Sequence, residues 1–318
     1  MPEESGQKQN WERDVLEKTL LAAVAEQRKA RRWGIFFKSL IFVYLFVILV
    51  IMIEPFSLTS IGKGKAHTAV VNVIGTISEG SDSDADRIIK GLRAAAEDGG
   101  TKGIILRMNT PGGTPVQAAY VYDEIRRIKQ QKPDLPIYAV VSDMCASGGY
   151  YIASATDKIF VNRASLIGSI GVIMNGFGFV NAMNKLGIER RLLTAGRHKA
   201  ILDPFSPVSG EEKAYVQTLL NRVHQQFIEA VRQGRGQRLH DDPDIFSGLV
   251  WTGGESIELG LADAIGNTDS VAREIIGTEK IVDFTQEEGV IDQLAGRLGT
   301  SFGQGLLSAV KAAGTSLQ

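Results

Sequence analysis

Apolar and polar positions divide the chain into a front part and a globular part. Residues 10–33 place apolar side chains at helical spacing among many charges, which predicts a charged amphipathic helix. Ile35 to Ile53 then forms a run of 19 residues in which Lys38 is the one charged residue. This length is close to the roughly 20 residues that a membrane-spanning helix needs. The pattern predicts a transmembrane anchor at residues 35–54.

Charges around this run predict its orientation. Arg28, Lys29, Arg31 and Arg32 precede it without an acid among them, so residues 1–34 are expected in the cytoplasm and everything after residue 54 outside. A cleaved signal peptide is the alternative. The long charged region before the run, and the lack of a small-x-small site closely after Ile53, favour an uncleaved anchor.

Residues 55–66 have the composition of a linker, and an alternation of short apolar runs with helical patterns follows. These patterns predict strands at 68–74, 103–108, 137–141, 158–161, 171–174 and 191–194, and helices at 84–96, 116–129, 181–186 and 209–233. Two small helices are expected within 255–280, and the Gly- and Ser-rich tail 281–318 is left unassigned. The alternation predicts an α/β domain over residues 67–280, with mostly parallel, buried strands.

Charge and the number of cysteines and histidines argue against several classes of function. The chain has 318 residues and a net charge of −1, so nothing overall suggests a nucleic-acid partner. Cys145 is the one cysteine, which rules out an intrachain disulfide. The four histidines are scattered and no spacing of His, Cys and carboxylates suits a metal, so we expect neither a metal nor another cofactor.

Ser147 lies where the strand at 137–141 gives way to a helical pattern, and Gly148 and Gly149 follow it. Unpaired N–H groups and a partial positive charge at a helix N-terminus suit an oxyanion, which forms when a serine attacks a carbonyl. When this stretch is taken alone, a tight turn of small residues that serves only packing explains it better.

Asn109 to Gly113 repeats the same arrangement of buried strand, Gly-rich turn and helix. Gly112 and Gly113 can present backbone N–H groups to a ligand. The carboxyl ends of parallel strands lie at one edge of a sheet, so the two turns are expected to meet there. A phosphate cradle is the alternative, but the GxxxxGK[ST] pattern is absent.

A nucleophilic serine needs a base, and Lys199 is the main candidate. A GxSxG elbow is absent, and His198 is the least unsuitable of the histidines, although a surface position explains it better. Lys199 follows a strand-like run, and a lysine acts as a general base when burial lowers its pKa towards neutrality. Ser169 could orient that lysine by accepting a hydrogen bond. Taken singly, each is also explained as an ordinary loop residue.

Four motifs in order resemble one family: Asn-x-Pro-Gly-Gly, Ala-Ser-Gly-Gly-Tyr-Tyr, Gly-Ser-Ile-Gly-Val and Ala-Gly-x-x-Lys, behind one anchor. Over residues 66–280 the chain resembles the short-form signal peptide peptidase A family of serine–lysine peptidases. The resemblance implies a Clp protease/crotonase-like domain of repeated ββα units. It implies that Ser147 is the nucleophile, Lys199 the general base and Ser169 the group that holds the lysine, with an oxyanion hole from Gly148, Gly112 and Gly113.

The resemblance also implies a homo-oligomer whose sites can combine residues of neighbouring subunits. The implied substrates are remnant signal peptides at a bacterial inner membrane, with the catalytic domain on its outer face. One departure is Ala195, where relatives often have serine. A catalytically idle membrane scaffold and a peptidase of other membrane proteins remain alternatives, whereas an acyl-CoA enzyme of crotonase type would need neither the anchor nor the serine–lysine pair.

Overall fold

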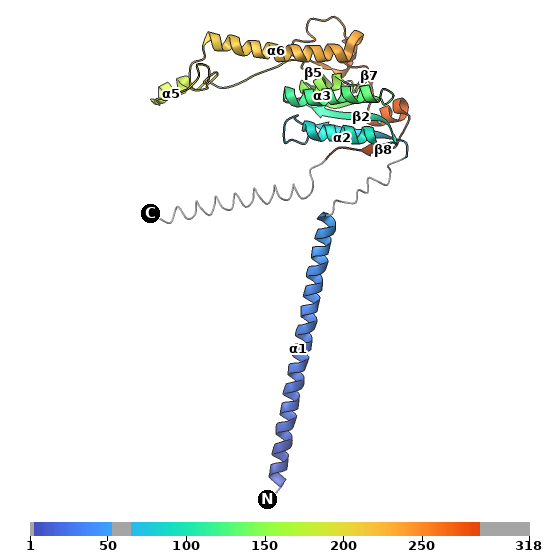
Figure 1. The fold of residues 1–318 in the computed structure, drawn as a ribbon, viewed down its shortest axis with the longest axis vertical. Coiled ribbons are helices and arrows are strands. Elements are labelled where there is room, and N and C mark those ends of the chain that lie inside the picture. Colours follow the sequence, from blue (N-terminus) through green and yellow to red (C-terminus); the bar gives the residue numbers. More distant parts are fainter. Residues whose placement is uncertain (1–2, 53–64, 287–318) are drawn as a thin grey trace. The chain divides into compact units, whose positions relative to one another are not determined.

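The computed structural model describes residues 3–52 and 65–286, and the chain divides into two compact units, Met1–Ile61 and Gly62–Gln318 (Figure 1). The first unit contains one continuous helix, α1 (Glu3–Met52), so the predicted amphipathic helix and most of the predicted anchor are one element. Within the described residues, no helix meets the length and hydropathy required to cross a membrane. The end of the predicted anchor, most of the linker and the tail from residue 287 lie outside the described residues.

The second unit is built on an eight-stranded sheet, in which one pair of strands is antiparallel and the other pairs are parallel. Its path is β6-β5-β3-β2-β1-β8, with β4 between β3 and β7. The strands are β1 (His67–Ile74), β2 (Thr101–Thr110), β3 (Ile137–Ala146), β4 (Lys158–Val161), β5 (Leu166–Gly168), β6 (Val250–Thr252), β7 (Ala264–Ile265) and β8 (Ile281–Asp283). The mixed α/β architecture agrees with the predicted fold class.

Strand β3 is the element that positions the site. Along one edge it pairs with β2, and along the other edge it pairs first with β4 and then with β5. Its ten residues therefore run past the end of β4, and its last residue, Ala146, lies beside Gly168 at the end of β5. This register brings the segments that follow both strands, Ser147 and Ser169, to the same edge of the sheet.

Helices cover the sheet and supply its main core. They are α2 (Ala85–Glu97), α3 (Pro115–Gln131), α4 (Gly148–Ser154), α5 (Val180–Leu186), α6 (Gly210–Arg235), α7 (Gly253–Glu258) and α8 (Thr268–Ser270), with η2 (Gly236–Arg238) and the π-helical η3 (Val271–Ile276). Ile88, Leu92 and Ile125 from α2 and α3 join strand residues such as Leu106 in this core. A smaller cluster joins Ile105 to Val271 of η3.

Most predicted elements are confirmed within a few residues, including α6 with its capping box at Ser209 and Glu212. Two predicted strands are wrong, because residues 171–174 and 191–194 form no strand and are mostly exposed. The apolar spacing in α6 predicts an inner face made of Val216, Leu219, Val223, Phe227 and Val231. Phe227 and Val231 are buried as predicted, but Leu219 is exposed. The sheet also continues beyond residue 280, because β8 pairs with β1.

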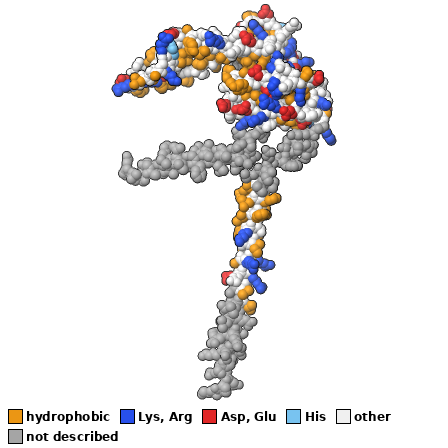
Figure 2. All heavy atoms as spheres, in the orientation of Figure 1, with side chains coloured by type: hydrophobic (Ala, Val, Ile, Leu, Met, Phe, Trp, Pro, Cys, Tyr) orange, Lys and Arg blue, Asp and Glu red, His pale blue; other side chains and the backbone are white. Residues whose placement is uncertain are grey.

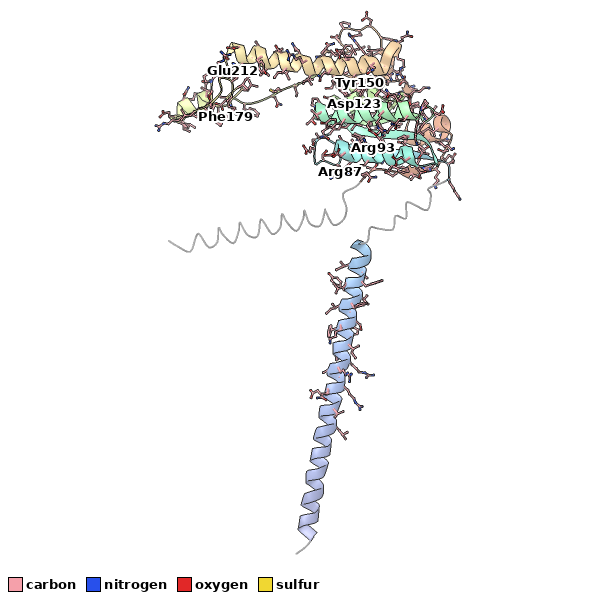
Figure 3. The ribbon with its side chains drawn as sticks, viewed as in Figure 1. Arg87, Arg93, Asp123, Tyr150, Phe179 and Glu212 are labelled. Atoms are coloured by element: carbon pink, nitrogen blue, oxygen red, sulfur yellow. The ribbon has the colours of Figure 1, made fainter. Side chains whose placement is uncertain are left out.

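Both wrong strands lie in a segment that we call the arm, residues 172–222. It contains α5 and the first half of α6, and none of its residues is buried. Figure 1 shows α5 at the end of α6 that lies away from the sheet, and Figure 3 labels Phe179 and Glu212 there, far from Tyr150. Among the described residues, the apolar runs at 171–174 and 191–194 have no strand beside them, and their backbone stays irregular.

Candidate active site

Ser147 occupies the sharp turn between β3 and α4, as the sequence predicts. It is the N-cap residue of α4, with φ 51° and ψ −121°. It is one of three non-glycine residues with positive φ in the described part of the chain. Such backbone costs about 1–3 kcal/mol and persists only where the surroundings enforce it. Here the Ser147 N–H donates to the carbonyl of Gly168 (2.8 Å), and its carbonyl accepts from the Tyr151 N–H (3.0 Å).

The Gly112–Gly113 turn lies directly against this serine. A Cβ atom on Gly112 would lie 2.7 Å from the carbonyl oxygen of Ala146, 2.7 Å from the nitrogen of Gly148 and 2.8 Å from the Cβ of Ser147. Gly112 also has a φ of 101°. A side chain at this position is thus excluded both by contact and by backbone conformation. The predicted meeting of the two glycine turns is confirmed.

Two backbone N–H groups are placed to bind an oxyanion there. Ile77 bonds to the carbonyl of Gly112 and to the N–H of Thr114, so the N–H between them, on Gly113, points away from Ile77. A Cβ atom on Gly148 would lie 3.1 Å from that Gly113 nitrogen. Gly148 is the first residue of α4, and the first N–H groups of a helix have no partner within it.

Gly112 differs from the other two glycines of the predicted oxyanion hole. Its N–H donates to the hydroxyl of Thr110 (3.0 Å), which is buried. Gly112 therefore contributes to the site by letting its backbone approach Ser147 closely, and not by offering a free N–H group. Thr110 is part of the sequence motif, but the motif alone did not reveal that its hydroxyl accepts this hydrogen bond.

Ser169 follows β5 and shares the backbone property of Ser147. Its φ is 52°, and its N–H donates to the carbonyl of Leu249 (2.7 Å). Ser147, Gly148, Gly113 and Ser169 line one cleft of about 860 Å³. The rest of its lining is largely apolar and aromatic, and includes Pro111, Val116, Tyr120, Tyr151, Val223 and Phe227. Asp123 is the one carboxylate among its lining residues.

Lys199 is not brought into this cleft by its own chain. It is exposed on the arm, where its N–H donates to the carbonyl of Gly196 (3.1 Å) and Gly196 has a φ of 106°. The Ala-Gly-x-x-Lys motif thus forms a tight turn that needs glycine. His198, the weaker candidate for the base, lies in the same turn and is contacted by the side chain of Arg197 (3.0 Å).

Cys145, two residues before Ser147, is not a competing nucleophile. Its side chain is buried, with its sulfur 3.8 Å from the sulfur of Met108. Burial raises the pKa of the Cys145 thiol far above its ordinary value, so the thiolate does not form at neutral pH. Of the two candidates at the end of β3, only Ser147 is open to the cleft.

His224 is a cleft residue for which the histidine motifs gave no signal. Its Nε2 lies 3.0 Å from the carbonyl oxygen of Ile170, next to Ser169. The helical pattern could have found it, because it directly follows Val223, which was predicted to face inwards. A histidine next to an inward-facing position of a helix can hydrogen-bond to the backbone of the domain on which the helix packs.

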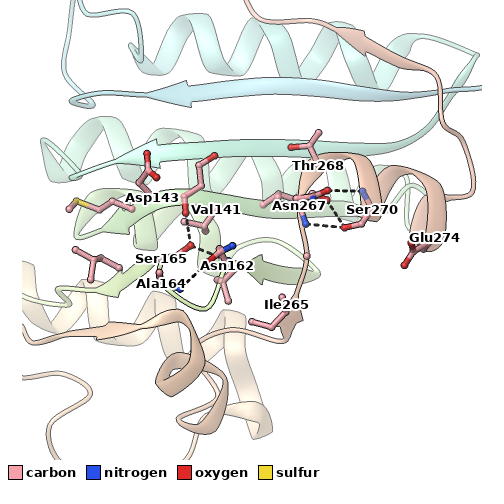
Figure 4. Close-up of a pocket in the computed structure, with 16 residues that line it drawn as sticks. Val141, Asp143, Asn162, Ala164, Ser165, Ile265, Asn267, Thr268, Ser270 and Glu274 are labelled. Carbon is pink, nitrogen blue, oxygen red and sulfur yellow. Dashed lines mark hydrogen bonds between the residues drawn. The ribbon is translucent and has the colours of Figure 1, made fainter.

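A second cavity, of about 730 Å³, contains none of the predicted site residues (Figure 4). It is lined by the second half of β3, the turn between β4 and β5, and the segment from β7 to η3. Its side chains largely bond to one another or to nearby backbone, as in the pair Asn267 and Ser270 and the bond from Ser165 to the carbonyl of Ser142. Ser147, the candidate nucleophile, lines the other cleft.

Comparison with known proteins supports a peptidase. The model of peptidase family S49 matches residues 129–281, a range that contains Ser147, Ser169 and Lys199. A putative signal peptide peptidase SppA of Enterococcus faecium is 32% identical over 194 residues, which are 61% of this chain and 56% of that protein. Protease 4 of Haemophilus influenzae is 31% identical over 228 residues, 70% of this chain and 36% of that protein.

A third relative has a different name. The Na(+)/H(+) antiporter NhaA of Brucella abortus is 40% identical over 188 residues, 58% of this chain but 25% of that protein. This chain therefore spans from a quarter to just over half of the length of these three relatives. The family match and the protease relatives support the resemblance that the motifs indicated: residues 129–281 match the model of peptidase family S49, and the chain is similar to proteins named signal peptide peptidase SppA and protease 4.

Proposed function

We propose that the chain is a serine endopeptidase in which Ser147 attacks a peptide carbonyl. The observation that carries this proposal is the strained Ser147 at the end of an apolar cleft, in contact with the Gly112–Gly113 turn. The N–H groups of Gly113 and Gly148 hold the oxyanion. An acyl-enzyme forms on the Ser147 oxygen as the amine leaves, and water then releases it.

Lys199 is the proposed general base, and a neighbouring copy of the chain supplies it. The support is the position of Lys199 on the exposed arm and its absence from the cleft of its own chain. Insertion into a largely apolar cleft removes the amine from water, which favours its neutral form. The neutral amine takes the proton of Ser147 and later passes it to the leaving group. Ser169 accepts a hydrogen bond from the amine and orients it.

We also propose that the chain assembles into a homo-oligomer through the arm. Its exposed apolar side chains include Ile173, Phe177, Leu186 and Leu193. Figure 2 shows apolar side chains along the arm, in orange, with Lys and Arg at its tip. Surface of this kind favours burial against another protein surface. We call the rest of the described catalytic unit, residues 65–171 and 223–286, the body. We propose that the body has the Clp protease/crotonase-like arrangement of ββα units, a superfamily whose members assemble.

Remnant signal peptides at a bacterial inner membrane are the proposed substrates. The support is the apolar character of the cleft and the apolar run in α1, whose side chains from Leu40 to Val47 are exposed. We propose that this run anchors the chain, with residues 1–34 in the cytoplasm and the catalytic domain on the outer face. Peptides left in the membrane are apolar and would be held close to the cleft.

A labelling and hydrolysis experiment tests the proposed activity against an idle scaffold. The full chain in detergent is treated with a fluorophosphonate probe and, separately, with a quenched apolar peptide. Ser147→Ala should abolish both signals, a loss of at least about 10⁴-fold in hydrolysis. Ser142→Ala, an exposed serine five residues earlier, is the control and should keep both. An unlabelled, inactive wild-type protein, or an active Ser147→Ala variant, would contradict the proposal.

A further inference from the structure

The loop that carries Ser169 has a backbone that needs support from outside itself. Ser169 has a φ of 52° and follows Gly168, with a φ of 113°. Glycine adopts such angles freely, but a serine there costs about 1–2 kcal/mol. Backbone bonds to Leu249 and within the loop hold one side of it, including the bond from the Gly171 N–H to the Ser169 carbonyl (2.9 Å).

His224 supplies a contact from the other side of this loop. Its Nε2 lies 3.0 Å from the carbonyl oxygen of Ile170, the residue after Ser169. A carbonyl oxygen only accepts, so Nε2 carries the proton and donates it. Within the described residues, this is the one side-chain hydrogen bond to the segment 168–172. The side chain of Ile170 is also buried. Because both the side chain and the carbonyl of Ile170 are held, rotation of the backbone between Ser169 and Ile170 is limited.

Helix α6 packs against α4 and α3 directly after His224. One turn later, Phe227 is buried and its ring lies 5.0 Å from the ring of Tyr151 on α4. Further along α6, the carbonyl of Ala230 accepts from the hydroxyl of Tyr122 on α3 (3.2 Å). His224 lies just past the end of the arm, where α6 begins to pack on the body. Both Tyr151 and His224 thereby connect α6 to the serine loops.

We infer that His224 is a positioning residue, which holds Ser169 in its left-handed conformation through the carbonyl of Ile170. The inference rests on the proposed function, because it gives Ser169 the task of orienting the lysine. The same loop accepts the Ser147 N–H through the carbonyl of Gly168, so Ser169 is held beside the proposed nucleophile. His224 also lines the cleft, but the inference assigns it no part in the proton transfers or in bond cleavage.

Two substitutions separate the hydrogen bond from simple packing. His224→Leu keeps the bulk and removes the donor, whereas His224→Gln keeps an N–H donor at a comparable distance from the backbone. Loss of a hydrogen bond to a half-buried carbonyl should lower kcat for peptide hydrolysis by about tenfold, with KM unchanged, in His224→Leu. His224→Gln should recover most of kcat. Gln225→Leu, at the next and exposed position, is the matched control and should behave as wild type.

A double-mutant cycle with Ser169→Ala tests the route of the effect. If His224 acts through Ser169, adding His224→Leu to Ser169→Ala should lower kcat no further. Full additivity of the two losses, or a wild-type kcat in His224→Leu, would overturn the inference.

Hydrogen exchange gives a reading that does not depend on catalysis. The Ser169 N–H should exchange faster in His224→Leu than in wild type and His224→Gln, while amides in β2 stay unchanged. A failure of the proposed function would appear as an inactive wild type with this exchange pattern intact. Equal exchange in all three proteins would overturn the inference by itself.

Discussion

The body of the catalytic unit and its arm are built from similar proportions of apolar residues, yet they use them differently. In the body, strand residues such as Ala69, Ile104 and Leu106 are completely buried between the sheet and its helices. In the arm, residues 172–222, no residue is buried, and Ile173 and Leu193 are 85% and 95% exposed. The body completes its own core, whereas the arm, within the part of the chain that the structure describes, leaves its apolar side chains exposed or half-buried.

The proposed chemistry divides along the same boundary. Ser147, Ser169 and the N–H groups of Gly113 and Gly148 belong to the body, which fixes their positions without help. Lys199 belongs to the arm and is not among the residues that line the cleft, to which the arm contributes Val172 and Ile173 at its start. On the proposed mechanism, we expect the peptidase to be inactive as a single chain and active when a second chain covers the cleft. Three expected results test this account of the molecule, from the largest effect to the smallest, and a complementation experiment then tests it most directly.

The largest effect is expected from charges placed on the arm. The double variant Leu186→Asp and Leu193→Asp introduces two carboxylates on surface that we expect to be buried in the oligomer. Burying a charge without a partner costs several kcal/mol, so assembly should fail and hydrolysis should fall by about 10³-fold or more. Size-exclusion chromatography and the peptide assay measure the two losses.

The stability of the body should not change in that variant, within about 0.5 kcal/mol, because exposed positions of the monomer contribute little to its folding. Ile275→Asp is the matched control, since Ile275 is a half-exposed apolar residue of η3 on the body. It should assemble and remain active. A fully active arm variant would show that the arm has no part in the site.

An intermediate effect is expected from Gly112→Ala. The added methyl group would approach the Ala146 carbonyl and the Gly148 nitrogen to 2.7 Å, so the oxyanion donors must move. We expect kcat to fall by about 10²–10³-fold, as for loss of an oxyanion donor. Denaturation should show a loss of about 1–3 kcal/mol in the free energy of unfolding.

Gly99→Ala is the control for that substitution, because a Cβ atom on Gly99 would meet nothing within 4 Å. Its kcat should match that of the wild type. A Gly112→Ala protein with normal kcat would place the oxyanion elsewhere.

The smallest effect is expected from Glu124, which concerns the body alone. Glu124 on α3 is buried and accepts hydrogen bonds from Arg93 on α2 and Arg127 on α3, which lower its pKa from 4.5 to about 2. A carboxylate with a lowered pKa stabilises the fold above pH 4.5, and this contribution disappears as the pH falls towards 2. Glu124→Gln should therefore cost about 1–3 kcal/mol of stability at pH 7.

The gap between the wild type and Glu124→Gln should close as the pH is lowered through this window. Thermal unfolding at several pH values measures it, with Glu258→Gln, at an exposed position of α7, as the control. Hydrolysis per folded molecule at pH 7 should stay at the wild-type level. A stability difference that is independent of pH would contradict the role given to the Glu124 carboxylate.

The same boundary separates what the sequence predicted from what it did not. Strands such as 158–161 were predicted closely because their apolar positions are buried, and α6 was predicted closely because its capping box is local. The strands predicted at 171–174 and 191–194 are absent, because apolar runs in the arm have no sheet beside them. The short strands β6 and β7 were missed, since two or three residues carry no periodicity.

For the site, the turns around Ser147 and Gly112 were predictable because glycine and small residues mark them directly. The left-handed conformations of Ser147 and Ser169 were not, since they depend on bonds to residues distant in sequence, Gly168 and Leu249. The contact from His224 to Ile170 spans 54 positions and has no local signal. The motif around Lys199 marked it as a candidate base, but its position relative to Ser147 was not predictable, because it lies on the arm.

The most direct test of this division is complementation between two inactive chains. Ser147→Ala and Lys199→Ala, carried on differently tagged full-length chains, are produced singly and together. If each site combines Ser147 of one chain with Lys199 of a neighbour, random mixing restores about a quarter of wild-type hydrolysis, since one ordered pair in four is intact. Each variant alone should be inactive. If the mixture is as inactive as its components, both residues of a site come from one chain, and the account of the arm is contradicted.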